Sequence, residues 1–378
     1  SNVTSSKSAE AVAELKSARY PKRHSMTSKC NNIPNRSFEA AEQQLRSDNF
    51  ELCIKTCNEI LGLGQCNAMT YILKACAESE MGYFSKCALT LASMPNDVTI
   101  PQQMKLQIGA LMELSQTMLT VENFQLSGAY KRVIGVIKRM KTGQSNKFVL
   151  LARAKSFLCL GDTNMAITDA TAILDTDKRN VKALIIRANA LFFNTEFKKA
   201  LSDCEMALEV DPCSKKAVDV HDRCRHVFDL LIVADKKMLR KSYEKAIKVL
   251  SKAIHVAGGI FQSSLLFHKV YLARSKAHLG DKNYKKALKD SNMVLAFNDA
   301  KDLNAWKIKI KAMKKMKLHS ELAKELAEIV KPGMWGSNHC LIIEAYEEAR
   351  FAAKNTLTHN SSVPLYKAES CMTPARCA

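Results

Sequence analysis

The chain has 378 residues, a formal net charge of +20, 13 glycines and 8 prolines. This length can bury one large core or many small cores in series. The few glycines and prolines and the modest aromatic content favour an all-α protein over one that is rich in sheets. The positive charge attracts acidic partners of any kind, such as nucleic acid, anionic lipid or acidic protein, without choosing among them.

The thirteen cysteines do not form a disulfide pattern, because their number is odd and no Cys-x-x-Cys pair occurs. We interpret most of them as small buried apolar residues in a reducing compartment. No apolar run is long enough to predict a transmembrane helix. We therefore expect a cytoplasmic protein.

Residues 1–36 are polar and basic and lack the hydrophobic core of a signal peptide, so we expect a disordered arm. A composition like that of an organelle transit peptide is the weaker alternative. Residues 34–101 are expected to hold two helical repeats. Three residues recur 34 positions later, at the eighth, seventeenth and twentieth places of the unit: Ala41 as Ala75, Phe50 as Phe84, and Cys53 as Cys87.

Residues 102–214 are expected to hold repeats three to five. A long helix is predicted from Gln102 to about Val121. Phe124 and Ser127, read as the seventeenth and twentieth places, put a degenerate third repeat near 108–141.

The clearest repeats are residues 147–180 and 181–214, two copies of the same 34-residue unit. Both have small residues at the eighth and twentieth places and a bulky residue at the eleventh, and the second also ends with a proline at the thirty-second. These residues are Ala154 and Ala188, Ala166 and Ala200, Phe157 and Leu191, and Pro212. The pattern is typical of tetratricopeptide (TPR) repeats, in which small residues let two helices approach and proline ends the second helix.

Residues 215–336 are expected to hold repeats six to eight. Ala246 follows Ala200 by 46 positions, which predicts a 12-residue extension of the helix around Val218–Val233. Three residues place the seventh repeat and three the eighth, which we read with one inserted residue: Gly280, Tyr284 and Ala287, then Ala305, Trp306 and Ala323. An amphipathic capping helix is expected within 337–356 and a disordered tail at 357–378.

Residues 34–332 resemble the TPR region of co-chaperones of the DnaJ homologue subfamily C member 7 (TPR protein 2) type. The resemblance rests on the places of the 12- and 7-residue insertions and on segments such as YILKACAESEMGYFSKC, RANALFFNTEFKKALSDCEMALEVDP and ARSKAHLGDKNYKKALKDSN. It implies nine repeats, a J domain, and an adaptor role between the Hsp70 and Hsp90 chaperones. Only eight repeats are recognisable here and no His-Pro-Asp triplet occurs. We therefore expect no J-domain activity from this chain.

The resemblance also implies a carboxylate clamp, in which Lys, Asn and Arg side chains hold the C-terminal carboxylates of a chaperone tail. In our alignment the clamp places of the last three repeats hold Leu231, Asp235, Ala273, Asn304 and Ile308. Those of the first two repeats hold Glu39, Met69 and Leu73. Because no clamp residue is present, we do not expect Hsp70 or Hsp90 tails to bind in the usual way.

Lysine and arginine gather at 235–252 and 307–317. These runs and two residues that lie between them provide the candidate partner-binding residues: Lys236, Lys237, Arg240, Arg274, Asn304, Lys307, Lys309 and Lys311. An acidic protein or peptide, a nucleic acid, and plain solvation of a helix face all remain open. Aromatic residues suited to base stacking are sparse in these runs, with only Tyr243 and, beside the second, Trp306.

His221, Cys224 and His226 are residue types that zinc takes. On a helix His226 points away from the other two, so we favour ordinary helix residues and expect no metal or cofactor. No glycine-rich phosphate loop, nucleophile elbow or paired zinc motif indicates an enzyme.

The sequence therefore predicts an all-α TPR solenoid of about eight repeats with a C-terminal capping helix. Its expected function is that of a non-catalytic, co-chaperone-like scaffold that holds a protein or peptide partner in its concave groove. A basic adaptor for RNA or for acidic protein surfaces is the alternative.

Overall fold

The structure is a computed structural model of the whole chain, and it describes residues 35–64, 67–95, 100, 102–258, 264–297, 302–329 and 340–357. Regular structure in these residues is entirely α-helical, as the composition predicted. The arm expected at 1–36 and the tail expected at 357–378 lie almost wholly outside the described residues. The chain divides into two compact units, Ser1–Leu119 and Thr120–Ala378.

Unit 1 contains two helical hairpins and most of a longer helix. Its helices are α2 (Asn35–Arg46), α3 (Phe50–Gly62), α4 (Ala68–Glu80), α5 (Phe84–Ala92) and α6 (Gln102–Leu126), the last of which runs on into unit 2. Ala41, Cys53 and Cys57 are fully buried in one apolar cluster of this unit. The cysteines there fill the core as small apolar residues do.

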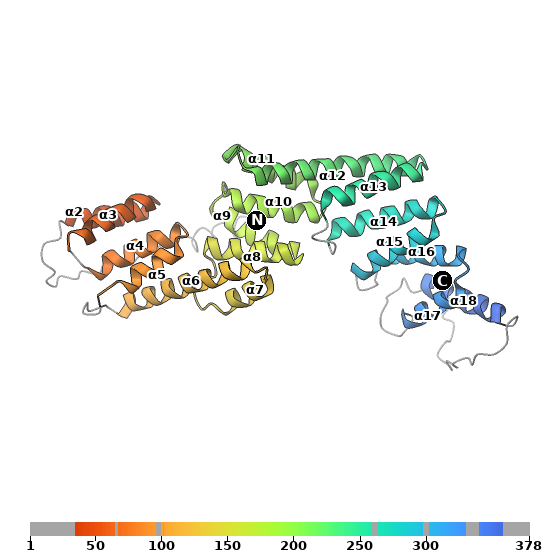
Figure 1. Cartoon of the computed structure of the whole chain (residues 1–378), viewed down its shortest axis with the longest axis horizontal. Coiled ribbons are helices and arrows are strands. Elements are labelled where there is room, and N and C mark those ends of the chain that lie inside the picture. Colours follow the sequence, from red (N-terminus) through yellow and green to blue (C-terminus); the bar gives the residue numbers. More distant parts are fainter. Residues whose placement is uncertain are drawn as a thin grey trace, which may run out of the picture. The chain divides into compact units, whose positions relative to one another are not determined.

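Unit 2 continues the alternation of helices joined by short turns. Its helices after α6 are α7 (Tyr130–Arg139), α8 (Lys147–Leu160), α9 (Thr163–Thr176), α10 (Val181–Phe193), α11 (Phe197–Val210), α12 (Lys215–Leu239), α13 (Tyr243–Ala257), α14 (Leu265–Gly280), α15 (Tyr284–Phe297), α16 (Leu303–Lys315), α17 (His319–Ile329) and α18 (Cys340–Leu357). Helices pack mainly against their neighbours in the chain (Figure 1). Such nearest-neighbour packing is the organisation of a helical repeat array.

One residue in the turn of each described hairpin adopts a left-handed backbone conformation. These residues are Asp48, Gly82, Gly128, Gly161, Thr195, Lys241, Lys282 and Lys317. A left-handed residue ends the first helix and reverses the chain into the second. Each stands at the fifteenth place of its unit, so together they fix the register of eight TPR repeats.

Two first helices are longer than the others, since α6 and α12 each have 25 residues. The turn residues before and after each of them, Gly82 and Gly128, and Thr195 and Lys241, are 46 positions apart instead of 34. The additional 12 residues lengthen the first helix by about three turns. The predicted extension of the sixth repeat is thus confirmed, and the third repeat contains the same extension.

The eighth and twentieth places of the repeats face the packed interior. The eighth places are at most 6% exposed and hold Ala41, Ala75, Val121, Ala154, Ala188, Ala234, Ser275 and Ile310. The twentieth places are all fully buried and hold Cys53, Cys87, Val133, Ala166, Ala200, Ala246, Ala287 and Leu322. Most of these side chains are small, which lets the two helices of a hairpin come close together.

Two details of the predicted register are wrong. Phe124 lies within α6 and Ser127 directly after it, so the second helix of the third repeat is α7, whose twentieth place is Val133. In the eighth repeat the fully buried residue is Leu322 and not Ala323, so no residue is inserted there. Both errors arose because a one-dimensional spacing was matched without knowing where the turn lies.

The capping helix predicted within 337–356 is α18. Its buried residues Ile342, Ala345 and Ala349 complete an apolar cluster with Leu322 and Leu326 of α17. α18 therefore covers the apolar face that the last hairpin would otherwise expose. No described helix is both long and apolar enough to cross a membrane.

Candidate functional site

The places of the carboxylate clamp lie on α12, α14 and α16, the first helices of the last three repeats. Asp235 and Asn304 are exposed, whereas Leu231 and Ala273 are half-buried against the apolar core. Ile308 is only 5% exposed and packs against Ala287 and Ala312. These side chains offer one negative charge and no positive charge toward a ligand.

Two of the predicted binding residues are used inside the fold. Arg274 forms two hydrogen bonds, of 2.7 and 2.8 Å, to the carboxylate of Asp290. Lys309 is buried, pairs with Glu325 at 2.5 Å, and lies 4.9 Å from the centre of the Trp306 ring. Neither cation is free to bind a partner in this arrangement.

These two pairs belong to a recurring contact between the seventh and twenty-third places of the repeats, which the sequence reading missed. The members of each pair are 16 residues apart: Arg153 and Asp169, Arg187 and Asp203, Arg274 and Asp290, and Lys309 and Glu325. Each pair joins the two helices of one hairpin. In the fifth repeat, the hydrogen bonds to the carboxylate raise the pKa of Arg187. The constant 16-residue separation was the signal available in the sequence.

The remaining candidates divide between two places. Lys236 and Arg240 are exposed and Lys237 is half-buried at the end of α12, where positive charge complements the helix dipole. Lys307 and Lys311 lie on α16 and line a pocket of about 400 Å³ together with Ile310, Lys314 and Lys315. The structure therefore brings Lys307 and Lys311 together, but it does not place the α12 cations in this pocket.

A second pocket, of about 380 Å³, adjoins the first because both contain Lys311 and Lys315. Its other residues are Met238, Tyr243, Lys276, Leu279, Gly280 and Tyr284. The apolar atoms come from the end of α12, the start of α13, the end of α14 and the start of α15, and the lysines come from α14 and α16. Lysine side chains thus border an apolar floor.

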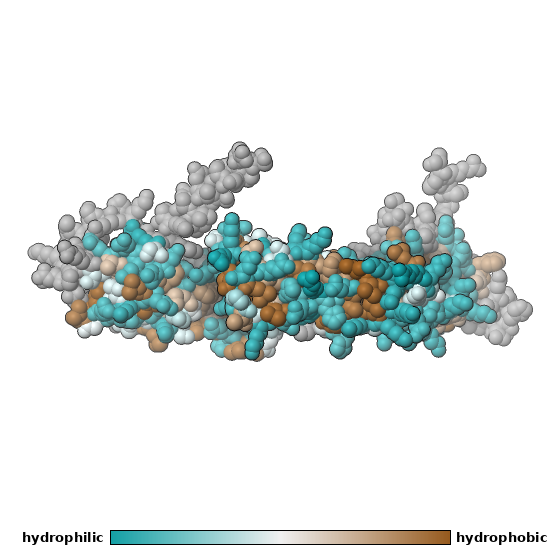
Figure 2. All heavy atoms as spheres, turned by 90° about the horizontal axis from the view of Figure 1, so that it is seen from above, coloured by the Kyte–Doolittle hydropathy of each residue, from teal (hydrophilic) through white to brown (hydrophobic). Residues whose placement is uncertain are grey.

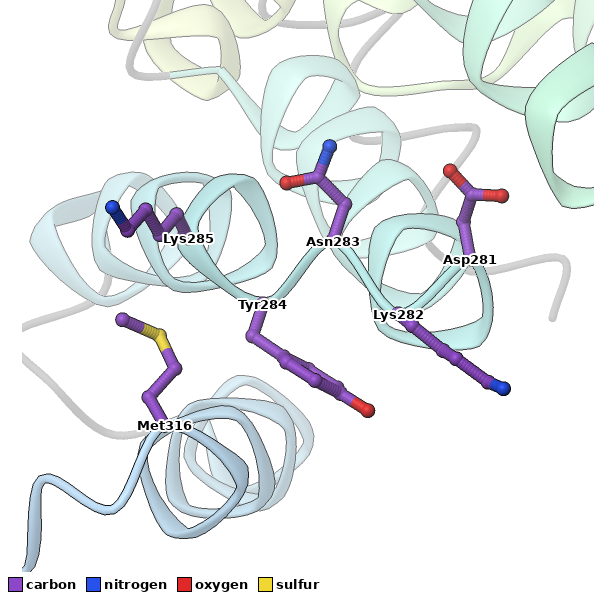
Figure 3. A pocket seen from close by; sticks show the side chains of 6 residues that line it. All are labelled: Asp281, Lys282, Asn283, Tyr284, Lys285 and Met316. Carbon is purple, nitrogen blue, oxygen red and sulfur yellow. The ribbon is translucent and has the colours of Figure 1, made fainter.

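A third pocket, of about 430 Å³, shares Tyr284 with the second, and its other lining residues are Asp281, Lys282, Asn283, Lys285 and Met316. Figure 3 shows Tyr284 and Lys282 extending to one side of the chain, while Asn283 and Asp281 extend to the other. We call the three adjoining pockets the lysine groove. It contains seven lysines, which are Lys276, Lys282, Lys285, Lys307, Lys311, Lys314 and Lys315.

The charge of the lysine groove is largely uncompensated. Lys314 pairs with Glu348 of α18. Within the described part of the chain, the other six lysines form no ion pair, and Asp281 is the one carboxylate that lines the groove. Lys307, Lys311 and Lys315 are four residues apart on α16 and so lie along one face of it.

The floor of the groove depends on a glycine. A Cβ atom at Gly280 would lie 2.6 Å from atoms of the Tyr243 ring, which is closer than atoms can pack. Gly280 therefore lets the aromatic ring of one repeat rest on the end of the next repeat's first helix. The sequence analysis used Gly280 only to place the seventh repeat; the left-handed residue in the turn of that repeat is Lys282.

An apolar area lies elsewhere on unit 2. Val218, Ile232, Val233 and Leu239 are exposed large apolar residues of α12. Figure 2, seen from the side of α11 to α13, shows hydrophobic residues gathered among hydrophilic ones.

The three residues considered as zinc ligands do not converge. Cys224 is fully buried, with its sulfur 3.8 Å from the carbonyl oxygen of Phe197, and His221 lies beside Asp222. His226 is exposed. In the described residues no group of three or more His, Cys, Asp or Glu side chains is arranged to hold a metal ion.

Known proteins are similar to parts of the chain. No protein-family model matches the chain. The DnaJ homologue subfamily C member 7 homologue of Schizosaccharomyces pombe is 22% identical over 285 residues, which cover 73% of this chain and 59% of that protein. Translocon at the outer membrane of chloroplasts 64 of Pisum sativum is 33% identical over 101 residues, covering 27% of this chain and 16% of that protein.

Among solved structures, a crystal structure of the P58(IPK) TPR domain covers 85% of this chain and 98% of its own, at 12% identity and a TM-score of 0.49. The helical hairpins and their buried small residues show that the chain is an all-α TPR protein. Its resemblance to DnaJ homologue subfamily C member 7 is confirmed by the relative from Schizosaccharomyces pombe. It spans 59% of the length of that relative.

Proposed function

We propose that this protein is a non-catalytic, co-chaperone-like TPR scaffold that binds an acidic region of a partner protein in the lysine groove. The observation that carries this proposal is the set of six lysines without an ion pair in the described structure, around an apolar floor. Unpaired cations beside apolar surface favour a ligand that supplies both carboxylates and apolar side chains.

The proposed binding does not use a carboxylate clamp. The clamp places hold a carboxylate, an amide and three apolar residues, and all three apolar residues, Leu231, Ala273 and Ile308, pack in the apolar core. Asp235 repels a terminal carboxylate instead of holding it. Any contact with an Hsp70 or Hsp90 chaperone would therefore use a surface other than the extreme C-terminus of its tail.

Capture of partners from a cell extract tests this function. The immobilised chain is compared with the Lys311→Glu/Lys315→Glu variant and with Lys215→Glu/Lys216→Glu, a control with the same charge change at two exposed lysines at the start of α12. We expect proteins that bind the wild type and the control but not the groove variant. An excess of free chaperone tail peptide should not displace them, and displacement would refute binding without a clamp.

RNA is the competing partner for a basic surface, so the extract is also tested after nuclease treatment. The two tyrosines in the groove are half-buried and one ring is packed on Gly280, which leaves little aromatic surface for base stacking. Loss of all groove-dependent capture after nuclease treatment would assign the surface to nucleic acid instead.

A further inference from the structure

The spacing of charges in the lysine groove restricts the ligand further, on the premise of the proposed function. Lys307, Lys311 and Lys315 are four residues apart, so successive ammonium groups start from helix positions about 6 Å apart along α16. In an extended peptide, side chains on the same side are two residues apart, or about 6.6 Å. A row of acidic side chains at every second position therefore matches the row of lysines over its whole length.

The apolar floor of the groove determines which side chains fit at the intervening positions of the bound peptide. In an extended segment the side chains between the acidic ones point the other way. The apolar floor is formed by Met238, Tyr243, Leu279 and Tyr284, none of which belongs to α16. Large apolar side chains fit this floor, and the Tyr243 ring, which is packed against Gly280, gives the floor a fixed shape.

The size of the pockets suits individual side chains of a ligand. The two pockets that share Lys311 and Lys315 have volumes of about 400 and about 380 Å³. Each pocket has room for a few side chains, which an extended strand presents one after another along the groove.

The geometry points to an extended, internal segment of a partner protein in which acidic and large apolar residues alternate. Such a segment presents carboxylates to Lys307, Lys311 and Lys315 and apolar side chains to the floor between α12 and α15. It needs no free C-terminus, because no clamp residue is present to hold a terminal carboxylate. The partner segment is thus recognised by its alternating acidic and apolar side chains, and not by a C-terminal carboxylate.

Fluorescence anisotropy with synthetic peptides tests this inference. The probe is an N-acetylated, C-amidated nine-residue peptide with Asp and Leu alternating. A peptide of the same composition with its aspartates in one block is the comparison. We expect the alternating peptide to bind at least about tenfold more tightly than the block peptide, and to bind equally well with a free or an amidated C-terminus.

Variants locate the binding. Affinity should fall at least about tenfold in Lys311→Glu/Lys315→Glu, and also fall in the milder Lys311→Gln/Lys315→Gln if thermal unfolding shows the first variant to be destabilised. It should be unchanged in Lys215→Glu/Lys216→Glu. Equal losses in the two charge-reversal variants would mean unspecific attraction by net charge and would overturn the inference.

Other outcomes are also decisive. Equal binding of the alternating and block peptides, or a requirement for a free C-terminus, would refute recognition by alternation. If no peptide binds while capture of proteins from extract still depends on Lys311 and Lys315, the scaffold function stands and this ligand class is wrong. If both fail, the proposed function fails with it.

Discussion

Replacing Arg187 by methionine should show how strongly the recurring ion pairs hold each hairpin together. Arg187 of α10 forms hydrogen bonds of 2.8 and 2.7 Å to the two carboxylate oxygens of Asp203 in α11. The side chain of Asp203 is 7% exposed and that of Arg187 is 23% exposed. Removing the guanidinium leaves a nearly buried carboxylate without its partner.

The magnitude follows from this burial. Breaking a buried pair by removing one partner costs about 3–5 kcal/mol. Because a part of Arg187 is in contact with solvent, water screens the pair, and we expect a lower cost of about 2–3 kcal/mol. The double variant Arg187→Met/Asp203→Leu removes both charges and should recover most of this loss, since apolar replacement of a buried pair is close to neutral.

Native-state hydrogen exchange of α10 and α11 is the suitable assay, because a repeat array need not unfold in one step. The matched control is Lys248→Met, which breaks a pair of the same 2.7 Å length with Glu244 on an exposed face. We expect no measurable change in the control. A loss in Arg187→Met as small as in the control, or a double variant as unstable as the sum of the single variants, would refute the reasoning.

Three further predictions concern single residues. Thr195 has a φ of 66°, which is unfavourable for a β-branched residue. Thr195→Gly should therefore raise the free energy of unfolding by about 1 kcal/mol, although it loses the hydrogen bond from Lys269. If urea unfolding shows Thr195→Gly to be no more stable than Thr195→Ala, this prediction is contradicted. Burial lowers the pKa of His278, so the imidazole binds a proton more readily in the unfolded state than in the folded state. The free energy of unfolding should therefore fall as the pH drops below about 6.5. This fall should be smaller in His278→Gln, and the same pH dependence in the variant and the wild type would argue against a role of His278. Burial raises the pKa of the Cys204 thiol to about 12, whereas Cys213 is exposed. Of these two cysteines, maleimide at neutral pH should therefore modify only Cys213, as measured by peptide mass spectrometry. Similar labelling of both would count against the burial of Cys204.

The repeat class could be predicted from the sequence because its signal lies in small side chains at fixed places. Ala154, Ala166, Ala188 and Ala200 all proved fully buried. The turns were harder to find, because most left-handed residues are not glycine. Lys241, Lys282 and Lys317 adopt this conformation although lysine ordinarily indicates an exposed helix.

The candidate site could be predicted only in part, because each residue of a helix is rotated by about 100° from the one before it. Lys307 and Lys311 are exposed in the groove, whereas Lys309 between them is buried against Trp306 and Glu325. A run of lysines in the sequence does not show this difference. The apolar floor was also missed, because its residues come from separate turns that only the packing of repeats brings together.

Lysine footprinting of the whole chain tests the lysine groove most directly. Reductive dimethylation, followed by mass spectrometry, is measured with and without a saturating amount of the amidated, alternating Asp-Leu peptide. We predict that the peptide slows modification of Lys276, Lys307, Lys311 and Lys315 and leaves Lys215 and Lys248 unchanged. Uniform slowing over all exposed lysines, or protection confined to residues outside the groove, would contradict the account.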